Sequence, residues 1–186
     1  MKSIAVYCGA NAGANPLYVQ AARAMGRALV AQDIGLVFGG GHVGLMGTIA
    51  DAVLEAGGKA TGVIPQQLVD RELAHPGLTQ LFVVKDMHER KAMMASLADG
   101  FIAMPGGMGT LEELFEMLTW SQLGIHAKPV GVFNVNGFYD HMVQFLSHAL
   151  AEGFIQQKHA GLMQVAADPD ELIGMLAQRA RAGASV

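Results

Sequence analysis

Short apolar runs alternate along the chain with longer stretches in which apolar residues recur at helical spacing. Several short runs, such as 4–8 and 100–104, are almost continuously apolar, which is typical of parallel strands covered on both faces. The pattern predicts strands at residues 4–8, 34–38, 60–64, 81–84, 100–104, 130–134 and 163–166. It predicts helices at about residues 16–32, 43–57, 87–98, 108–124, 138–152 and 169–182.

This alternation predicts an α/β fold: a single doubly wound, Rossmann-like domain with a mostly parallel sheet flanked by helices. We expect the domain to span residues 1–182 and the tail, residues 183–186, to be frayed. In such folds ligands bind beyond the carboxyl ends of the strands, where loops lead into helix N-termini. Those loops are therefore the places to search for function.

Composition narrows the class of protein. The 186 residues include 24 glycines, but 52% are hydrophobic, which excludes collagen and a disordered chain. A net charge of −4 without a basic run argues against nucleic acid as a partner. The longest uncharged stretch, 3–22, is interrupted by Asn and Pro, so we expect no membrane span. The single cysteine, Cys8, excludes an internal disulfide and fits a cytoplasmic location.

A first glycine loop, with the sequence GGGHVGLMG at 39–47, follows the strand at 34–38. Gly39, Gly41 and Gly44 match the dinucleotide-binding fingerprint, which also expects an acidic residue at the end of the next strand. That strand ends at Ile64-Pro65 without one. Two interpretations stay open: tight turns with close helix packing, or phosphate and sugar binding through bare NH groups such as those of Gly40 and Gly41.

A second glycine loop, PGGMGTLEE at 105–113, leaves a strand and opens a helix. Its NH groups and a threonine hydroxyl favour phosphate binding by Gly106, Gly107, Met108, Gly109 and Thr110. Thr110 and Glu113 also have the spacing of a capping box, in which both side chains only stabilise the helix. The apolar face of the predicted helix leaves Glu113 off the core, so capping and catalysis are both open from the residues alone.

Between the two loops, residues 87–91 (MHERK) begin a helix with two adjacent cations, Arg90 and Lys91. A solvated surface pair is the default interpretation, although cations in a first turn oppose the helix dipole. If the strand at 81–84 lies next to the strand at 100–104, both cations face one crevice, and Arg90 could hold phosphate or ribose. The seven histidines show no metal-binding spacing, so we expect no metal.

These three motifs, in this order and spacing, resemble the LONELY GUY family of cytokinin-activating phosphoribohydrolases, often labelled lysine decarboxylases. The resemblance covers the chain from Cys8 to about residue 165. It implies hydrolysis of the N-glycosidic bond of a nucleoside 5′-monophosphate, such as AMP or a cytokinin riboside 5′-monophosphate, by a homodimer. It implies catalytic roles for Arg90 and Glu113. It also implies substrate contacts from Lys91, Gly107, Gly109, Thr110, Glu72 and Thr119.

Two departures from the family pattern bear on substrate preference. Ala10 and Asn11 stand where the family often has two serines, and His42 stands where a small residue is usual. We expect side chains such as Met87 and Met108 to shape the base pocket.

Two other functions compete with this one. A pyridoxal-dependent decarboxylase needs a Schiff-base lysine, and no lysine of the chain has such a sequence context, so we expect no cofactor. A module that binds or senses a nucleotide without turnover fits the glycine loops equally well. The pairing of Arg90 with Glu113 favours the enzyme.

Overall fold

Within residues 1–71 and 73–183, which the computed structural model describes, seven parallel strands form one sheet in the order β4-β3-β2-β1-β5-β6-β7. The strands are β1 (Ser3–Tyr7), β2 (Gly35–Phe38), β3 (Ala60–Pro65), β4 (Gln80–Val84), β5 (Gly100–Ala103), β6 (Val130–Phe133) and β7 (Met163–Ala166). The predicted strands and the α/β class are confirmed. The sheet is parallel throughout the described residues rather than mostly parallel.

The predicted helices are also present, with ends within about two residues of those expected. They are α1 (Leu17–Ala31), α2 (Gly44–Glu55), α4 (Met87–Leu97), α5 (Met108–Gln122), α6 (Asp140–Ala151) and α7 (Pro169–Gly183). Three short pieces were not predicted: α3 (Gln66–Val69), η1 (Val135–Gly137) and η2 (Gln157–His159). Such pieces are too short to show a helical period. The expected tail falls largely on residues 184–186, which lie outside the described residues.

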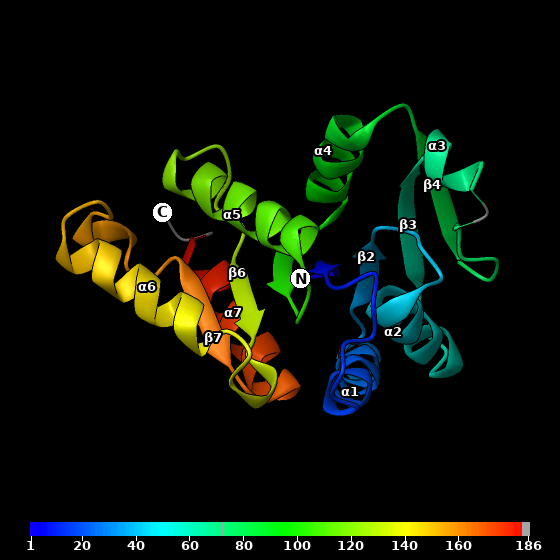
Figure 1. Cartoon of the computed structure of the whole chain (residues 1–186), viewed down its shortest axis with the longest axis horizontal. Coiled ribbons are helices and arrows are strands. Elements are labelled where there is room, and N and C mark those ends of the chain that lie inside the picture. The colour runs from blue at the N-terminus through cyan, green and yellow to red at the C-terminus, as the bar shows by residue number, and fades with distance from the viewer. Residues whose placement is uncertain (72, 184–186) are drawn as a thin grey trace.

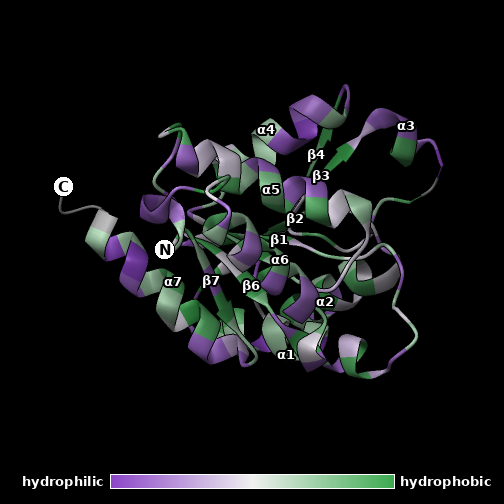
Figure 2. Ribbon diagram, turned by 60° about the vertical axis from the view of Figure 1, so that its left-hand side comes forward, coloured by the Kyte–Doolittle hydropathy of each residue, from purple (hydrophilic) through white to green (hydrophobic). Residues whose placement is uncertain are grey.

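The helices cover both faces of the sheet. In β1, Ile4 and Val6 point into the core beneath α1, α2 and α7, while Ala5 and Tyr7 point into the core beneath α4 and α5. Figure 1 shows α4 and α5 on the opposite side of the sheet from α1 and α2. The central strands are mostly apolar and the outer helices mixed (Figure 2). Burial on both faces explains why the strand sequences are apolar without alternation.

The strand order reverses at β1, which pairs with β2 on one side and with β5 on the other. The chain builds outward from β1 to the edge strand β4, then returns through α4 to β5. At such a switch point the loops after the two central strands separate and leave a crevice. Here one hydrogen bond joins these loops, from the Gly9 NH to the Pro105 carbonyl at 3.0 Å.

One premise from the sequence is wrong: the strand at 81–84 does not lie next to the strand at 100–104. β4 is the edge strand, and β3, β2 and β1 stand between it and β5. Helix α4 spans that distance by packing across β3, β2 and β1. This crossing, rather than neighbouring strands, brings the start of α4 towards the crevice. No helix of the described residues is long and apolar enough to cross a membrane.

Candidate active site

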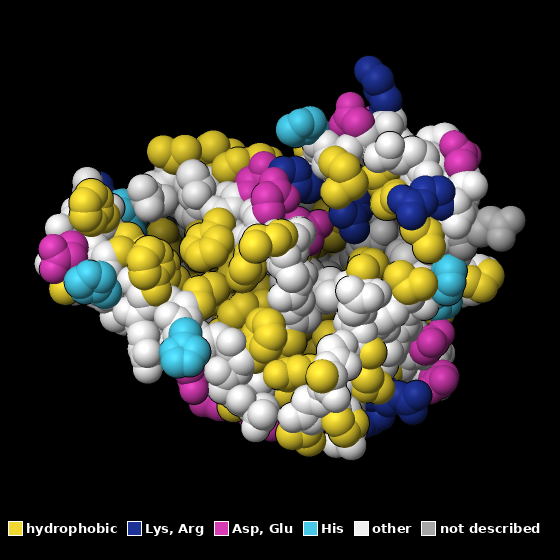
Figure 3. Space-filling view, in the orientation of Figure 1, with side chains coloured by type: hydrophobic (Ala, Val, Ile, Leu, Met, Phe, Trp, Pro, Cys, Tyr) yellow, Lys and Arg dark blue, Asp and Glu magenta, His cyan; other side chains and the backbone are white. Residues whose placement is uncertain are grey.

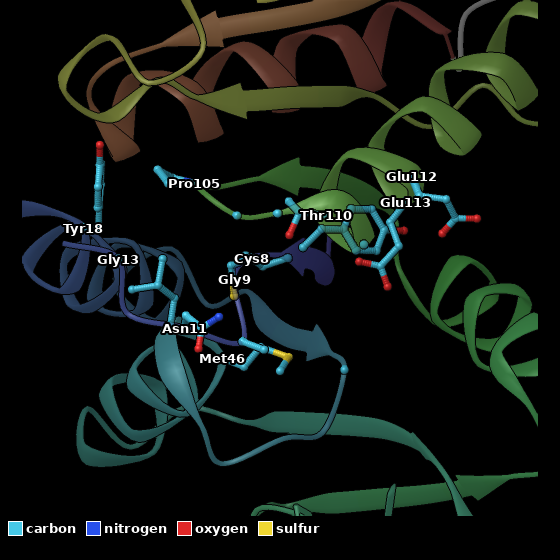
Figure 4. Close-up of a pocket in the computed structure, with 18 of the residues that line it drawn as sticks. Cys8, Gly9, Asn11, Gly13, Tyr18, Met46, Pro105, Thr110, Glu112 and Glu113 are labelled. Carbon is cyan, nitrogen blue, oxygen red and sulfur yellow. The ribbon is translucent and has the colours of Figure 1, made fainter. Parts of the chain in front are cut away.

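A cavity of about 390 Å³ opens at the switch point, where the loops after β1, β2 and β5 meet. Its backbone walls come from residues 9–13, Gly39 and residues 105–107. Its side chains include Tyr7, Tyr18, Met46, Met87, Met94, Arg90, Thr110, Glu113 and Phe138. Figure 4 shows Gly9 and Gly13 of the loop after β1 and Thr110 and Glu113 of the second glycine loop around this cavity. The cavity therefore combines an exposed backbone with few charged groups.

Arg90 is buried and held at three points. Its Nε donates to the Val63 carbonyl at 3.1 Å, and its Nη1 donates to Glu113 Oε1 at 3.3 Å. Nη1 also lies 3.9 Å from the sulfur of Met87. The interpretation of Arg90 and Lys91 as a solvated surface pair is wrong, because both are less than a tenth exposed. In Figure 3, acidic and basic side chains meet between α4 and α5.

The first glycine loop makes room for this arginine. A Cβ at Gly39 would lie 1.7 Å from Arg90 Nη2, so only glycine fits beside the guanidinium. Gly40 and Gly41, expected to bind substrate, are absent from the cavity lining. Their backbone instead pairs with the segment before β4, since Gly40 O accepts from the His75 NH at 2.9 Å and Gly41 forms a bridge with Ala74.

His42 belongs to the same arrangement. Its NH donates to the Leu73 carbonyl at 3.0 Å, and its Nδ1 lies 3.1 Å from that oxygen. Tight turns and packing therefore account for residues 40–42 of this loop.

Glu113 lies on α5, one turn into the helix, and is 8% exposed. Burial raises its pKa to about 7, although the neighbouring Arg90 lowers the pKa. The capping-box interpretation is wrong: the N-cap is Gly107, no side chain caps the helix, and Thr110 already lies inside the helix. The Glu113 carboxylate accepts a hydrogen bond from Arg90 and does not cap the start of α5.

The second glycine loop presents unused donors. No NH group from Gly106 to Thr110 donates a hydrogen bond within the described part of the chain. A Cβ at Gly107 or Gly109 would meet nothing within 4 Å, so this space is open to a ligand. Thr110 is buried and lines the cavity. Met108 is 86% exposed and lies outside the lining.

The structure brings together six of the expected site residues and separates others. Arg90, Gly106, Gly107, Gly109, Thr110 and Glu113 line the cavity. Lys91 does not line it, and its Nζ binds Glu112 and, at 3.1 Å, Glu116. Thr119 donates to the Phe115 carbonyl at 2.7 Å and lines a second cavity. Glu72 lies outside the described residues.

Lys91 is a buried cation with two carboxylate partners. Burial lowers the pKa of Lys91, but the hydrogen bonds from Nζ to Glu112 and Glu116 outweigh this and leave the pKa above its ordinary value. Lys91 is therefore charged and joins α4 to α5.

Several lining side chains were not predicted, namely Tyr7, Cys8, Tyr18, Met46, Met94 and Phe138. Tyr7 stands at the end of β1, stacked on Phe101 with ring centroids 6.2 Å apart. Burial is the main cause that raises the pKa of Tyr7 well above its ordinary value, and the negative charge of Glu113 raises the pKa further. The rule that sites follow strand ends could have identified Tyr7 and Cys8. Nothing local marks Tyr18 or Phe138, because only the fold brings them together.

Among the described residues, no three His, Cys, Asp or Glu side chains cluster closely enough to hold a metal ion.

Comparisons with known proteins show which family the chain belongs to. The family model described as possible lysine decarboxylase matches residues 46–176. A Rhodococcoides fascians protein named cytokinin riboside 5′-monophosphate phosphoribohydrolase is 53% identical over 155 residues, covering 83% of this chain and 78% of that protein. An Arabidopsis thaliana protein also named cytokinin riboside 5′-monophosphate phosphoribohydrolase is 47% identical over 175 residues, covering 94% of this chain and 81% of that protein.

Among solved structures, the Moco carrier protein from Chlamydomonas reinhardtii is similar, with a TM-score of 0.74 at 22% identity. The match covers 97% of this chain and 98% of that one. At this identity the likeness concerns the fold alone.

Proposed function

Because the chain belongs to the LONELY GUY family, whose model is described as possible lysine decarboxylase, we propose that it catalyses the hydrolysis for which its relatives are named. It cleaves the N-glycosidic bond of a nucleoside 5′-monophosphate, AMP or a cytokinin riboside 5′-monophosphate, and releases the base and ribose 5-phosphate. The observation that carries this proposal is the buried pair of Arg90 and Glu113, one helical turn from a loop of unused NH donors.

The loop at 106–110 supports a role in binding the 5′-phosphate. Unpaired NH groups at a helix N-terminus carry about half a positive charge, which favours an anion there. Thr110 adds a hydroxyl, and the bare glycines let the phosphate approach the backbone closely. The phosphate then fixes the nucleotide so that its ribose lies towards Glu113.

Glu113 supplies the negative charge that the reaction needs. Cleavage of an N-glycoside passes through a state in which the ribose ring becomes positively charged. A fixed carboxylate in a site that excludes water stabilises that charge far more than water does. Oε2 of Glu113 accepts no hydrogen bond within the described residues, so it is free for a ribose hydroxyl or for the attacking water.

Arg90 orients this carboxylate and stays charged at any working pH. The hydrogen bonds from Nε to Val63 and from Nη1 to Glu113 favour one orientation of the guanidinium. Its remaining nitrogen, Nη2, lies beside Gly39 at the cavity wall and is placed to bind the nucleotide.

The alternatives have less support. A pyridoxal-dependent decarboxylase needs a lysine in its pocket, and the residues that line this cavity include none in the described part of the chain. A buried carboxylate beside a loop of unused NH donors favours turnover over binding alone.

The test is release of the free base from AMP and from isopentenyladenosine 5′-monophosphate, followed by chromatography, for the wild-type protein and for Glu113→Gln; the hydrolase is refuted only if neither substrate releases its base. We expect the variant to lose about 10²–10³-fold in kcat, because the charge is lost while the shape is kept. Glu152→Gln, at an exposed glutamate that follows α6, is the matched control. Wild-type rates in a folded Glu113→Gln protein would refute the catalytic role.

The proposal extends to a homodimer formed through the outer face of α5 and α6. Phe115 is exposed on this face and lines the second cavity, of about 250 Å³, together with Leu118 of α5 and Val143, Leu146 and Leu150 of α6. Hydrophobic side chains gather there in Figure 3. Thr119 lies on the same face, so it would contact substrate only in a neighbouring subunit. We also propose a cytoplasmic location, in keeping with the free and buried thiol of Cys8.

A further inference from the structure

The cavity continues past the second glycine loop to an end that holds none of the residues assigned to the hydrolysis above. Tyr18, at the start of α1, and Phe138, after β6, form this aromatic end, with ring centroids 5.7 Å apart in an edge-to-face contact. Tyr18 and Glu113 lie at opposite ends of the residues drawn in Figure 4, with Gly9 and Thr110 between them. Phe138 is 40% exposed, so part of its ring is free to contact a ligand.

The backbone around Phe138 holds its ring in place. The turn before it contains two left-handed residues, Asn136 at φ 50° and Gly137 at φ 70°. A left-handed non-glycine residue is costly and persists only where its surroundings hold it. Here the Asn134 side chain accepts from the Tyr139 NH at 2.8 Å, and the Tyr139 hydroxyl donates to the Met104 carbonyl at 2.6 Å. The turn is thereby tied to the end of β5.

Tyr18 is held in a comparable way. Gly13 has φ 76°, and a Cβ there would lie 2.7 Å from the Tyr18 ring. The loop after β1 therefore packs its bare backbone against that ring. Left-handed backbone therefore holds both rings at the cavity wall: that of Gly13 beside Tyr18, and that of Asn136 and Gly137 before Phe138.

A second set of unused donors lies between the aromatic end and the loop at 106–110. Residues 10–13 line the cavity, and none of their NH groups donates a hydrogen bond within the described residues. The carboxylates of the lining, Glu112 and Glu113, stand at the other end of the cavity. A mononucleotide brings one phosphate, whereas two neighbouring loops with unused donors in the cavity wall match two phosphates in succession.

We propose that the aromatic end is a second base subsite and that the cavity binds a 5′,5′-linked dinucleotide, two nucleosides joined through a diphosphate. One nucleoside lies towards Glu113, an orientation that rests on the proposed hydrolase function. The other extends past residues 10–13 and places its base against Phe138 and Tyr18. Aromatic side chains bind any base through its flat face, so this subsite selects for a planar ring rather than for a particular base.

The test compares calorimetric affinities for diadenosine 5′,5′-diphosphate, ADP and AMP. In the wild-type protein we expect the dinucleotide to bind at least about tenfold more tightly than ADP, because only the dinucleotide supplies the second base. We expect Phe138→Ala to abolish the tighter binding of the dinucleotide relative to ADP. Tyr18→Leu, which keeps an apolar side chain without a ring, should do the same. Phe154→Ala, at an exposed ring outside the cavity, is the matched control and should preserve the tighter binding.

Two outcomes would overturn the subsite. In the first, the wild-type protein binds the dinucleotide no more tightly than ADP. In the second, Phe138→Ala weakens ADP and the dinucleotide by the same factor, which would place a mononucleotide's own base at the aromatic end. Release of the free base from the two monophosphates is measured separately, so failure of the hydrolase and failure of the subsite give different results.

Discussion

At the scale of single residues, the absence of a side chain at position 39 decides where the Arg90 guanidinium lies. The space that a Cβ would occupy is filled by Nη2, and this position lets Nε reach Val63 and Nη1 reach Glu113. The first glycine loop thus serves the site indirectly. It makes room for the Arg90 guanidinium, while Gly40 and Gly41 lie outside the cavity lining.

Gly39→Ala should therefore impair catalysis without any direct contact with the chemistry. The added methyl group would displace Arg90 by an ångström or more, and misplacement of that order costs up to about 10²-fold in rate. We expect kcat for AMP to fall by about tenfold to 10²-fold. Gly174→Ala in α7, where a Cβ meets nothing within 4 Å, is the control and should retain full activity. Unchanged kcat in Gly39→Ala would contradict this account of the loop.

The residues alone did not decide what Glu113 does. The spacing from Thr110 to Glu113 satisfies a capping box, and the helical period only shows that Glu113 is off the apolar face. The deciding contact comes from Arg90, 23 positions earlier and on a different helix. By contrast, Gly106 and Gly107 were assigned correctly to a loop between strand and helix, because backbone freedom is a local property, whereas Gly109 lies in the first turn of α5.

At the scale of elements, α4 connects the edge of the sheet to its centre. Its start is capped by Asp86, whose carboxylate accepts from the His88 and Glu89 NH groups at 3.0 and 2.9 Å. Strands and helices could be predicted because burial leaves a pattern in the sequence. A strand buried on both faces is a short apolar run, and a helix buried on one face has apolar residues at helical spacing. The path of α4 could not be predicted, since strand order depends on packing between distant segments. Lys91, which looked solvated, ties this helix to α5 through Glu112 and Glu116.

Lys91→Met should change the pH dependence of the reaction. In the wild-type protein kcat/KM should fall as pH drops through about 7, because Glu113 acts as a carboxylate and its pKa is about 7. The charge of Lys91 lowers that pKa, and its loss leaves Glu112 to raise it further. The acidic limb of the profile should therefore move to higher pH, and the free energy of unfolding should fall by about 1–3 kcal/mol.

Lys91→Arg keeps the charge and is the matched rescue, with a profile close to that of the wild-type protein. An increase in KM without any displacement of the pH profile would instead indicate that Lys91 contacts the substrate directly. The two roles are therefore distinguished by one set of rate measurements across pH.

At the scale of the whole molecule, α6 is the helix that a single chain leaves uncovered. None of its residues is fully buried, although Val143, Phe145 and Leu146 are apolar. Exposed apolar side chains continue onto Leu123 and Ile125, which are 66% and 61% exposed after α5. Contiguous patches of this kind mark protein interfaces, and a self-complementary patch related by a twofold axis closes a dimer.

Phe115→Glu, on the α5 side of this face, should therefore convert the protein from a dimer to a monomer. The substitution places a carboxylate in the middle of the apolar face, and in a twofold interface each dimer would bury that charge twice. Sedimentation velocity over a range of concentrations should give a dimer for the wild-type protein and a monomer for the variant. Leu17→Glu, at a comparably apolar and exposed position on α1, should remain dimeric. A monomeric wild-type protein, or a dimeric Phe115→Glu, would show that this face does not form the subunit interface.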